Sequence, residues 1–164
     1  MFDVTPVTTD KMIACGPASL KMLLAYYGID VPLETLIEEC NTRIVGCTAS
    51  DIMRVARAHG LTDIVCYQMD GDEVIRQDRP AIIWWRYTHF CVSCGRDDHG
   101  NAVICNPGRG RYPLDEESFC SFYSRVAIFN GEPHDLPEPD PAPDVDPETA
   151  DKAEAYDILM GVSE

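Results

Sequence analysis

A change in hydrophobic period near residue 60 constrains the fold of this chain more than any other feature. Before it, apolar residues recur at helical spacing, which predicts helices over 15–28, 32–40 and 48–60. After it, short runs rich in Val, Ile, Trp and Cys predict strands over 63–69, 81–87, 89–95, 102–105 and 125–129, with a turn at 106–110 and short helical segments at 70–77 and 115–123. Helices followed by antiparallel strands predict an α+β fold.

The end of the chain differs in composition from the rest. The 164 residues carry a net charge of −15, of which −10 comes from 131–164 (1 Lys against 11 Asp and Glu) and −5 from 1–130 (12 Lys and Arg against 17 Asp and Glu). Proline alternates with acidic residues over 131–149, so we predict an extended linker there. Residues 1–130 are expected to form the folded domain and 150–164 a short, partly helical segment. The acidic tail is a candidate contact for a protein partner.

Charge and hydropathy argue against several kinds of partner. The chain lacks the basic patch that nucleic acid or an anionic membrane surface requires. It also lacks an apolar run approaching the roughly 20 residues of a membrane span and the features of a secretion signal. We therefore expect a cytoplasmic protein whose eight cysteines are reduced. No cofactor is expected.

Cys15 is the residue that most strongly suggests chemistry. It opens an apolar helix, where the helix dipole and free N–H groups favour a thiolate. We therefore predict that its pKa is lowered and that it is the most reactive of the cysteines. Gly16 is a candidate substrate-binding residue because it lets a peptide backbone approach, and the Cys15 amide is a candidate donor to an oxyanion.

A cysteine nucleophile needs a base, and His89 is the candidate. It begins one predicted strand, while Asn106 ends the next strand, just before Pro107. In an antiparallel hairpin these two ends lie together, so the Asn106 carbonyl could orient the imidazole. The three residues predict a Cys-His-Asn hydrolase. A buried structural thiol is the alternative for Cys15.

Three segments resemble motifs of the bacteriocin-processing, double-glycine leader peptidases, which are papain-like domains often fused to ABC transporters. They are Ala-Cys-Gly-Pro-Ala-Ser-Leu-Lys-Met-Leu-Leu-Ala-Tyr-Tyr-Gly over 14–28, His-Phe-Cys-Val-Ser-Cys-Gly over 89–95 and Val-Ile-Cys-Asn-Pro-Gly over 103–108. Their order and spacing agree with the family across 8–129. The resemblance implies a papain-like fold and a cysteine peptidase acting on a peptide or related amide. Its triad would be Cys15, His89 and Asn106.

Two positions depart from that family. Thr9 stands where the family usually has a Gln six residues before the cysteine, and Asn106 stands where it usually has Asp. The resemblance implies an oxyanion hole built from Thr9 and the Cys15 amide. Because Thr is a shorter donor, a module of the same fold that binds a peptide without cutting it is an alternative function. A third candidate function is that of a structural or assembly protein of a phage or mobile element, tethered through the acidic tail. The sequence contains no transporter, so no export function is expected.

Cys91 and Cys94 form a C-x-x-C pattern that could be taken for half of a zinc site. Residues three apart on a strand point to opposite faces, and no second pair has suitable spacing. We interpret both as core residues and expect no metal site.

Overall fold

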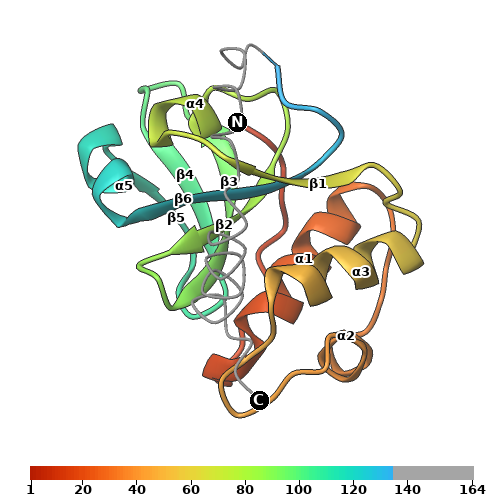
Figure 1. The fold of residues 1–164 in the computed structure, drawn as a ribbon. Helices are drawn as coiled ribbons and strands as arrows, with labels where there is room; N and C mark the ends of the chain where they lie inside the picture. The colour runs from red at the N-terminus through yellow and green to blue at the C-terminus, as the bar shows by residue number, and fades with distance from the viewer. Residues whose placement is uncertain (135–164) are drawn as a thin grey trace, which may run out of the picture.

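The computed structural model of the chain describes residues 1–134 (Figure 1). The helices precede the strands, as the change of period predicts. The elements are η1 (Met12–Ala14), α1 (Cys15–Tyr26), α2 (Leu33–Glu39), α3 (Ala49–Ala58), β1 (Ile64–Gln68), α4 (Gly71–Ile75), β2 (Ala81–Trp85), β3 (His89–Arg96), β4 (Ala102–Asn106), β5 (Gly110–Leu114), α5 (Glu116–Phe122) and β6 (Tyr123–Asn130). The predicted α+β class is confirmed. None of the helices in this part of the chain is long and apolar enough to cross a membrane.

The strands form one antiparallel sheet in the order β1-β6-β2-β3-β4-β5. Helices α1, α2 and α3 lie on one side of this sheet, while α4 and α5 lie on the other (Figure 1). A hydrophobic core lies on each side of the sheet, and alternate residues of β2 belong to the two cores. Ile82 and Trp84 pack with the first three helices, whereas Ile83 and Trp85 pack with α4 and α5. All five residues of β2 are buried, as its continuous apolar run predicts.

The two longest helices begin for different reasons. Thr48 and Asp51 form a capping box at the start of α3, with the Asp51 amide donating to Thr48 Oγ1 at 3.0 Å. Helix α1 has no side-chain cap, but nine of its first ten residues are buried, from Cys15 to Leu24. Packing rather than capping therefore holds the start of α1 in place.

Two elements were not anticipated. Strand β5 follows the predicted turn and contains Pro113, which cannot donate to a sheet and so weakens the strand signal. It lies at the edge of the sheet, where a proline is tolerated. The other is η1, which forms one 3₁₀ turn directly before Cys15.

The predicted boundary at residue 130 stays a prediction, since most of the predicted linker and the segment 150–164 lie outside the described residues. Contacts with the domain do continue slightly past Asn130. The Gly131 amide donates to the Asp63 carbonyl at 2.8 Å. The His134 amide donates to Gln77 Oε1 at 2.8 Å, and Gln77 Nε2 donates back to the His134 carbonyl at 3.1 Å.

Candidate active site

Cys15 is the first residue of α1 and lies where this helix packs against the start of β3. Its side chain is almost fully enclosed, with 8% of the residue exposed. The Phe90 amide lies close enough to influence the Cys15 sulfur, and Phe90 directly follows His89. The structure therefore brings the helix that carries Cys15 against the strand that carries His89, as the sequence predicts.

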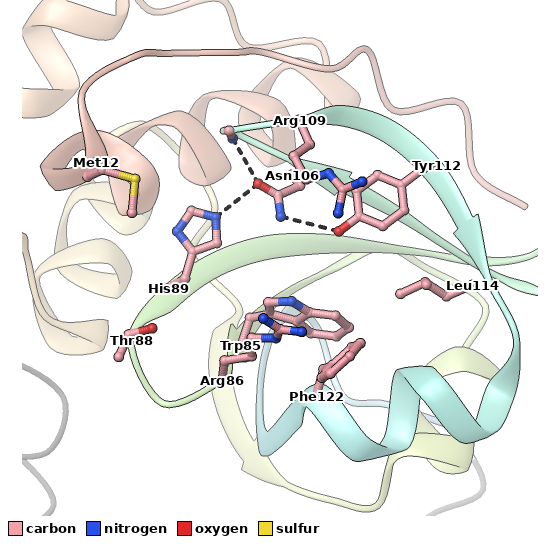
Figure 2. Close-up of a pocket in the computed structure, with 11 residues that line it drawn as sticks. Met12, Trp85, Arg86, Thr88, His89, Asn106, Arg109, Tyr112, Leu114 and Phe122 are labelled. Carbon is pink, nitrogen blue, oxygen red and sulfur yellow. Dashed lines mark hydrogen bonds between the residues drawn. The ribbon is translucent and has the colours of Figure 1, made fainter.

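His89 and Asn106 meet at one end of the sheet. His89 Nε2 lies 3.0 Å from Asn106 Oδ1 (Figure 2). This oxygen also accepts from the Gly108 amide at 2.8 Å, and Asn106 Nδ2 donates to Tyr112 Oη at 3.3 Å. Asn106 is thus held in one orientation by a backbone group and a side chain, and it in turn fixes the His89 ring.

These contacts determine the tautomer of a neutral His89 ring. Since Asn106 Oδ1 can only accept, Nε2 must carry the hydrogen and Nδ1 must carry the free lone pair. His89 Nδ1 is buried and has no hydrogen-bond partner among the described residues. A buried acceptor without a partner is costly in a structural role and is typical of a group that acts on something else. The arrangement thus leaves one basic nitrogen available next to the start of α1.

The predicted lowering of the Cys15 pKa is wrong. Burial raises the pKa of Cys15 above its usual range, and the backbone N–H groups of Phe90, Gly16 and Cys15 offset this effect only in part. The sequence placed Cys15 at a helix start but could not show that the surrounding side chains would enclose it. Burial therefore disfavours the charged thiolate of Cys15, and a nearby proton acceptor would help to form it.

Gly16 has a packing role that the sequence did not reveal. A Cβ atom at this position would lie 2.4 Å from Cys47 Sγ, 3.2 Å from Ile52 Cδ1 and 3.4 Å from Phe90 Cδ2. These contacts come from the helical layer and from β3, so they explain the glycine without any ligand. Its predicted role in binding substrate stays a prediction.

Thr9 lies beside the turn that follows Asn106. Its amide donates to the Pro107 carbonyl at 2.8 Å, and its Oγ1 accepts from the Lys11 amide at 3.1 Å. Among residues 1–134, the hydroxyl hydrogen of Thr9 remains available as a donor. The backbone contact explains how residues far apart in sequence stay aligned, but the predicted oxyanion role of Thr9 stays a prediction.

A pocket of about 370 Å³ opens on the sheet side of His89. Figure 2 shows the His89 ring and Met12 at one side of this pocket, with Tyr112, Leu114 and Phe122 across from them. The remaining lining comes from the last residues of β2 and β4 and from the turns that follow them, namely Trp85, Arg86, Thr88, Asn106, Gly108 and Arg109. The candidate base thus forms part of the wall of a cavity large enough for a side chain of a ligand.

Comparison with known proteins places this domain in a family. The model of the peptidase C39 family matches residues 5–134, so the chain belongs to this family. The probable microcin-H47 and the colicin V secretion/processing ATP-binding proteins of Escherichia coli are each 27% identical to it, over 116 and 117 residues. The matches cover 70% of this chain but only 16% of each of these relatives. Membership indicates a cysteine peptidase function for the domain.

Solved structures confirm the fold. One is a double glycine motif protease from an AMS/PCAT transporter, in complex with the leader peptide. It is 27% identical, with a TM-score of 0.71, covering 78% of this chain and 91% of that one. The peptidase domain of Streptococcus ComA, a bifunctional ABC transporter of a quorum-sensing pathway, is 22% identical with a TM-score of 0.66, covering 77% and 96%. The predicted resemblance to double-glycine leader peptidase domains is therefore confirmed.

Some residues around His89 were not identified from the sequence. Tyr112, which contacts Asn106, lies on the strand that the sequence did not reveal. Arg109 belongs to a Gly-Arg-Gly-Arg run over 108–111 that carries no recognised motif. The polar turn before β5 was the one available signal, since turns beside a sheet edge often carry binding residues.

Proposed function

We propose that this domain is a cysteine peptidase that cleaves a peptide bond with Cys15 as nucleophile, His89 as base and Asn106 as the residue that orients His89. The observation that carries this proposal is the buried Nδ1 of His89, which has no hydrogen-bond partner in the described part of the chain, while Asn106 fixes Nε2 at 3.0 Å. A nucleophile, a base and an orienting group in this order are the minimum for thiol catalysis.

The raised pKa of Cys15 determines how the first step proceeds. The thiol transfers its proton to His89 Nδ1 as its sulfur attacks the carbonyl carbon of the substrate. The resulting imidazolium stays bound to Asn106 Oδ1, which stabilises it without adding a charge. The negative oxygen that develops on the substrate needs N–H or O–H donors, and the Cys15 amide and the Thr9 hydroxyl are the candidates.

The remaining steps return the enzyme to its starting state. The tetrahedral intermediate collapses, the C–N bond breaks, and His89 gives its proton to the leaving amine. A water molecule then attacks the thioester on Cys15, with His89 again accepting a proton. The second collapse breaks the C–S bond and restores the Cys15 thiol, so that the net reaction is hydrolysis.

Exposed apolar residues around Cys15 suit a peptide substrate. Met12 and Ile13 of η1 are 76% and 38% exposed, and Ile44 and Val45, in the loop after α2, are 93% and 66% exposed. The two groups adjoin, since a Cβ on Gly46 would lie 3.7 Å from the Ile13 carbonyl oxygen. Large apolar side chains left in contact with water are typical of a surface that a partner covers. We infer that the substrate is a peptide segment with apolar residues. A peptide substrate also agrees with the similar transporter protease, whose structure is a complex with the leader peptide.

The test compares the full chain with two single variants on a library of peptides that contain a Gly-Gly pair. Wild type should cleave a subset, and a mass increase on Cys15 should mark the acyl-enzyme. Cys15→Ala should abolish both, whereas Cys120→Ala, which removes an exposed thiol on α5, should retain full activity. Peptide binding by wild type and Cys15→Ala without any cleavage would instead favour the peptide-binding module.

A further inference from the structure

The pocket beside His89 differs in charge from the domain around it. We call it the arginine pocket, because its lining includes Arg86 and Arg109 but no Asp or Glu. Residues 1–134 as a whole hold 12 Lys and Arg against 18 Asp and Glu. A positively charged pocket in an acidic domain favours a negatively charged ligand.

Most other cations of the described chain already have partners. Six form ion pairs with carboxylates: Lys21, Arg54, Arg76, Arg79, Arg96 and Arg125. Arg57 and Arg111 donate to backbone carbonyls. By contrast, neither Arg86 nor Arg109 has a carboxylate within 4.0 Å among residues 1–134. Among the described residues, both guanidinium groups on the pocket therefore keep their hydrogen-bond donors free of carboxylates.

Aromatic rings hold these two groups in place. The Arg86 guanidinium lies 4.0 Å from the centre of the Phe122 ring, and that of Arg109 lies 4.9 Å from the Tyr112 ring. Figure 2 shows Arg109 beside Tyr112 in one part of the pocket and Arg86 beside Phe122 in another. Stacking of this kind orients a guanidinium without neutralising its charge.

The backbone that carries Arg86 is strained. Arg86 and Tyr87 have φ values of 52° and 58°, in the left-handed region that side chains rarely adopt. The turn is anchored by Arg86 N donating to the Phe122 carbonyl at 2.8 Å and Tyr87 N donating to Ser124 Oγ at 2.9 Å. Strain maintained by surrounding contacts is common at functional sites, and here it lies immediately before His89.

We propose that the arginine pocket binds an acidic side chain of the peptide substrate, Asp or Glu, close to the bond that is cut. This inference rests on the proposed function and adds a determinant of specificity to it. His89 is both the candidate base and part of the pocket wall. Since an extended peptide advances about 3.3 Å per residue, the acidic residue should lie within about two residues of the cut. Its carboxylate would accept hydrogen bonds from Arg86 and Arg109.

Matched peptides provide the first test. Each Asp or Glu near the cleavage site of a cleaved peptide is replaced by Asn or Gln, which keeps the shape and removes the charge. We expect kcat/KM for the acidic member of at least one pair to be about 10- to 100-fold higher, the range expected for hydrogen bonds to a charged group. The difference should shrink as salt is added, since these arginines are exposed.

Variants of the protein then test whether the two arginines cause the preference for acidic peptides. Arg86→Gln and Arg109→Gln should each reduce it, and the double variant Arg86→Glu/Arg109→Glu should favour peptides with Lys at the same position. Arg76→Gln makes the same charge change on α4, where Arg76 pairs with Asp72, and should leave the preference intact. If the double variant fails to fold, the two single Gln variants still decide, because they remove one exposed charge each.

The outcomes separate this inference from the proposed function. Cleavage of acidic and amide peptides at equal rates would overturn the pocket assignment and leave the peptidase intact. If no peptide is cleaved, the proposed function fails. Fluorescence anisotropy with the same pairs then decides the pocket: about tenfold weaker binding of the amide member supports it, and equal binding overturns it. A last variant replaces the ten Asp and Glu of 135–164 by Asn and Gln. If the preference for acidic peptides emerges only in this variant, the pocket binds the chain's own acidic segment, and the substrate assignment is overturned.

Discussion

The helical side and the sheet side of the candidate active site hold their residues by different forces. On the helical side, Gly16 packs tightly against Cys47 and Phe90, and Cys15 beside it is buried. On the sheet side, His89 is positioned by its hydrogen bond with Asn106, which has two further partners of its own. Packing gives a buried candidate nucleophile with a raised pKa, while hydrogen bonding gives a candidate base with a defined tautomer.

This difference predicts distinct consequences for mutations on the two sides. Changes on the sheet side should mainly alter catalysis, because they remove individual hydrogen bonds or a proton acceptor. Changes on the helical side should mainly alter stability, because a close-packed region transmits any change of volume.

Replacing the base should have the largest effect on the proposed reaction. We expect His89→Ala to lower kcat about 10²- to 10⁴-fold, the usual contribution of general acid–base catalysis. His59→Ala, at the end of α3, is the matched control and should retain activity.

The same variant tests the raised pKa of Cys15 through alkylation by iodoacetamide, mapped by mass spectrometry. Without His89, only the thiolate formed by direct ionisation reacts, and a raised pKa means that this fraction is small at pH 7. The alkylation rate of Cys15 in His89→Ala should therefore increase about tenfold per pH unit from pH 7 to 9. An alkylation rate that is constant from pH 7 to 9 would contradict the raised pKa of Cys15.

The second largest effect concerns Thr9. If the oxyanion hole lacks a donor, Thr9→Gln should raise turnover by about 10²- to 10³-fold, the range reported for a single donor of this kind. The side chain is partly exposed, so a longer group should be accommodated. Cys15→Ala in the same background must remove the gain. If the wild type already has a high turnover rate and Thr9→Gln does not change it, another residue, such as Thr8, supplies the donor to the oxyanion.

The sequence predicted much of this arrangement, for identifiable reasons. His89 and Asn106 could be placed together because each lies at the end of a strand in one hairpin, and the pairing of strands is local. Burial of Cys15 could not be predicted, because it depends on how the first three helices pack against the sheet, and these elements come from distant segments. Nor could the arginine pocket, because Arg86 reaches it through a left-handed turn that its residue types do not favour.

Loss of the orienting residue should have a smaller effect than loss of the base. Asn106→Ala removes the hydrogen bond to His89, which strengthens when the ring is protonated, so we expect kcat to fall about 10- to 100-fold. Steady-state kinetics should show the change in kcat with little change in KM. Asn106→Asp keeps the acceptor oxygens and should restore most of the activity. If kcat of Asn106→Asp is as low as that of Asn106→Ala, the hydrogen bond from the Asn106 amide to Tyr112 matters more than the hydrogen bond to His89.

The smallest predicted effect is on stability, and it tests the helical side. In Gly16→Ala the added methyl would lie 2.4 Å from Cys47 Sγ, so the core must shift. Overpacking of this kind costs about 1–3 kcal/mol, measurable by urea unfolding. Cys47→Ala removes the clashing sulfur, so the double variant should regain most of that stability. A double-mutant cycle would show this as a favourable coupling between the two positions.

Activity of the double variant then distinguishes the two roles suggested for Gly16. If the glycine serves packing alone, restoring the space restores the position of Cys15, and turnover should recover together with stability. If the glycine is also needed for a substrate backbone to approach, the double variant should be stable but still impaired, with the loss in KM. Cys47→Ala alone provides the reference, because it leaves Gly16 in place and changes only the volume behind it. Recovery of stability without activity would therefore show that the helical side also binds substrate, and that packing is not its only contribution to the site.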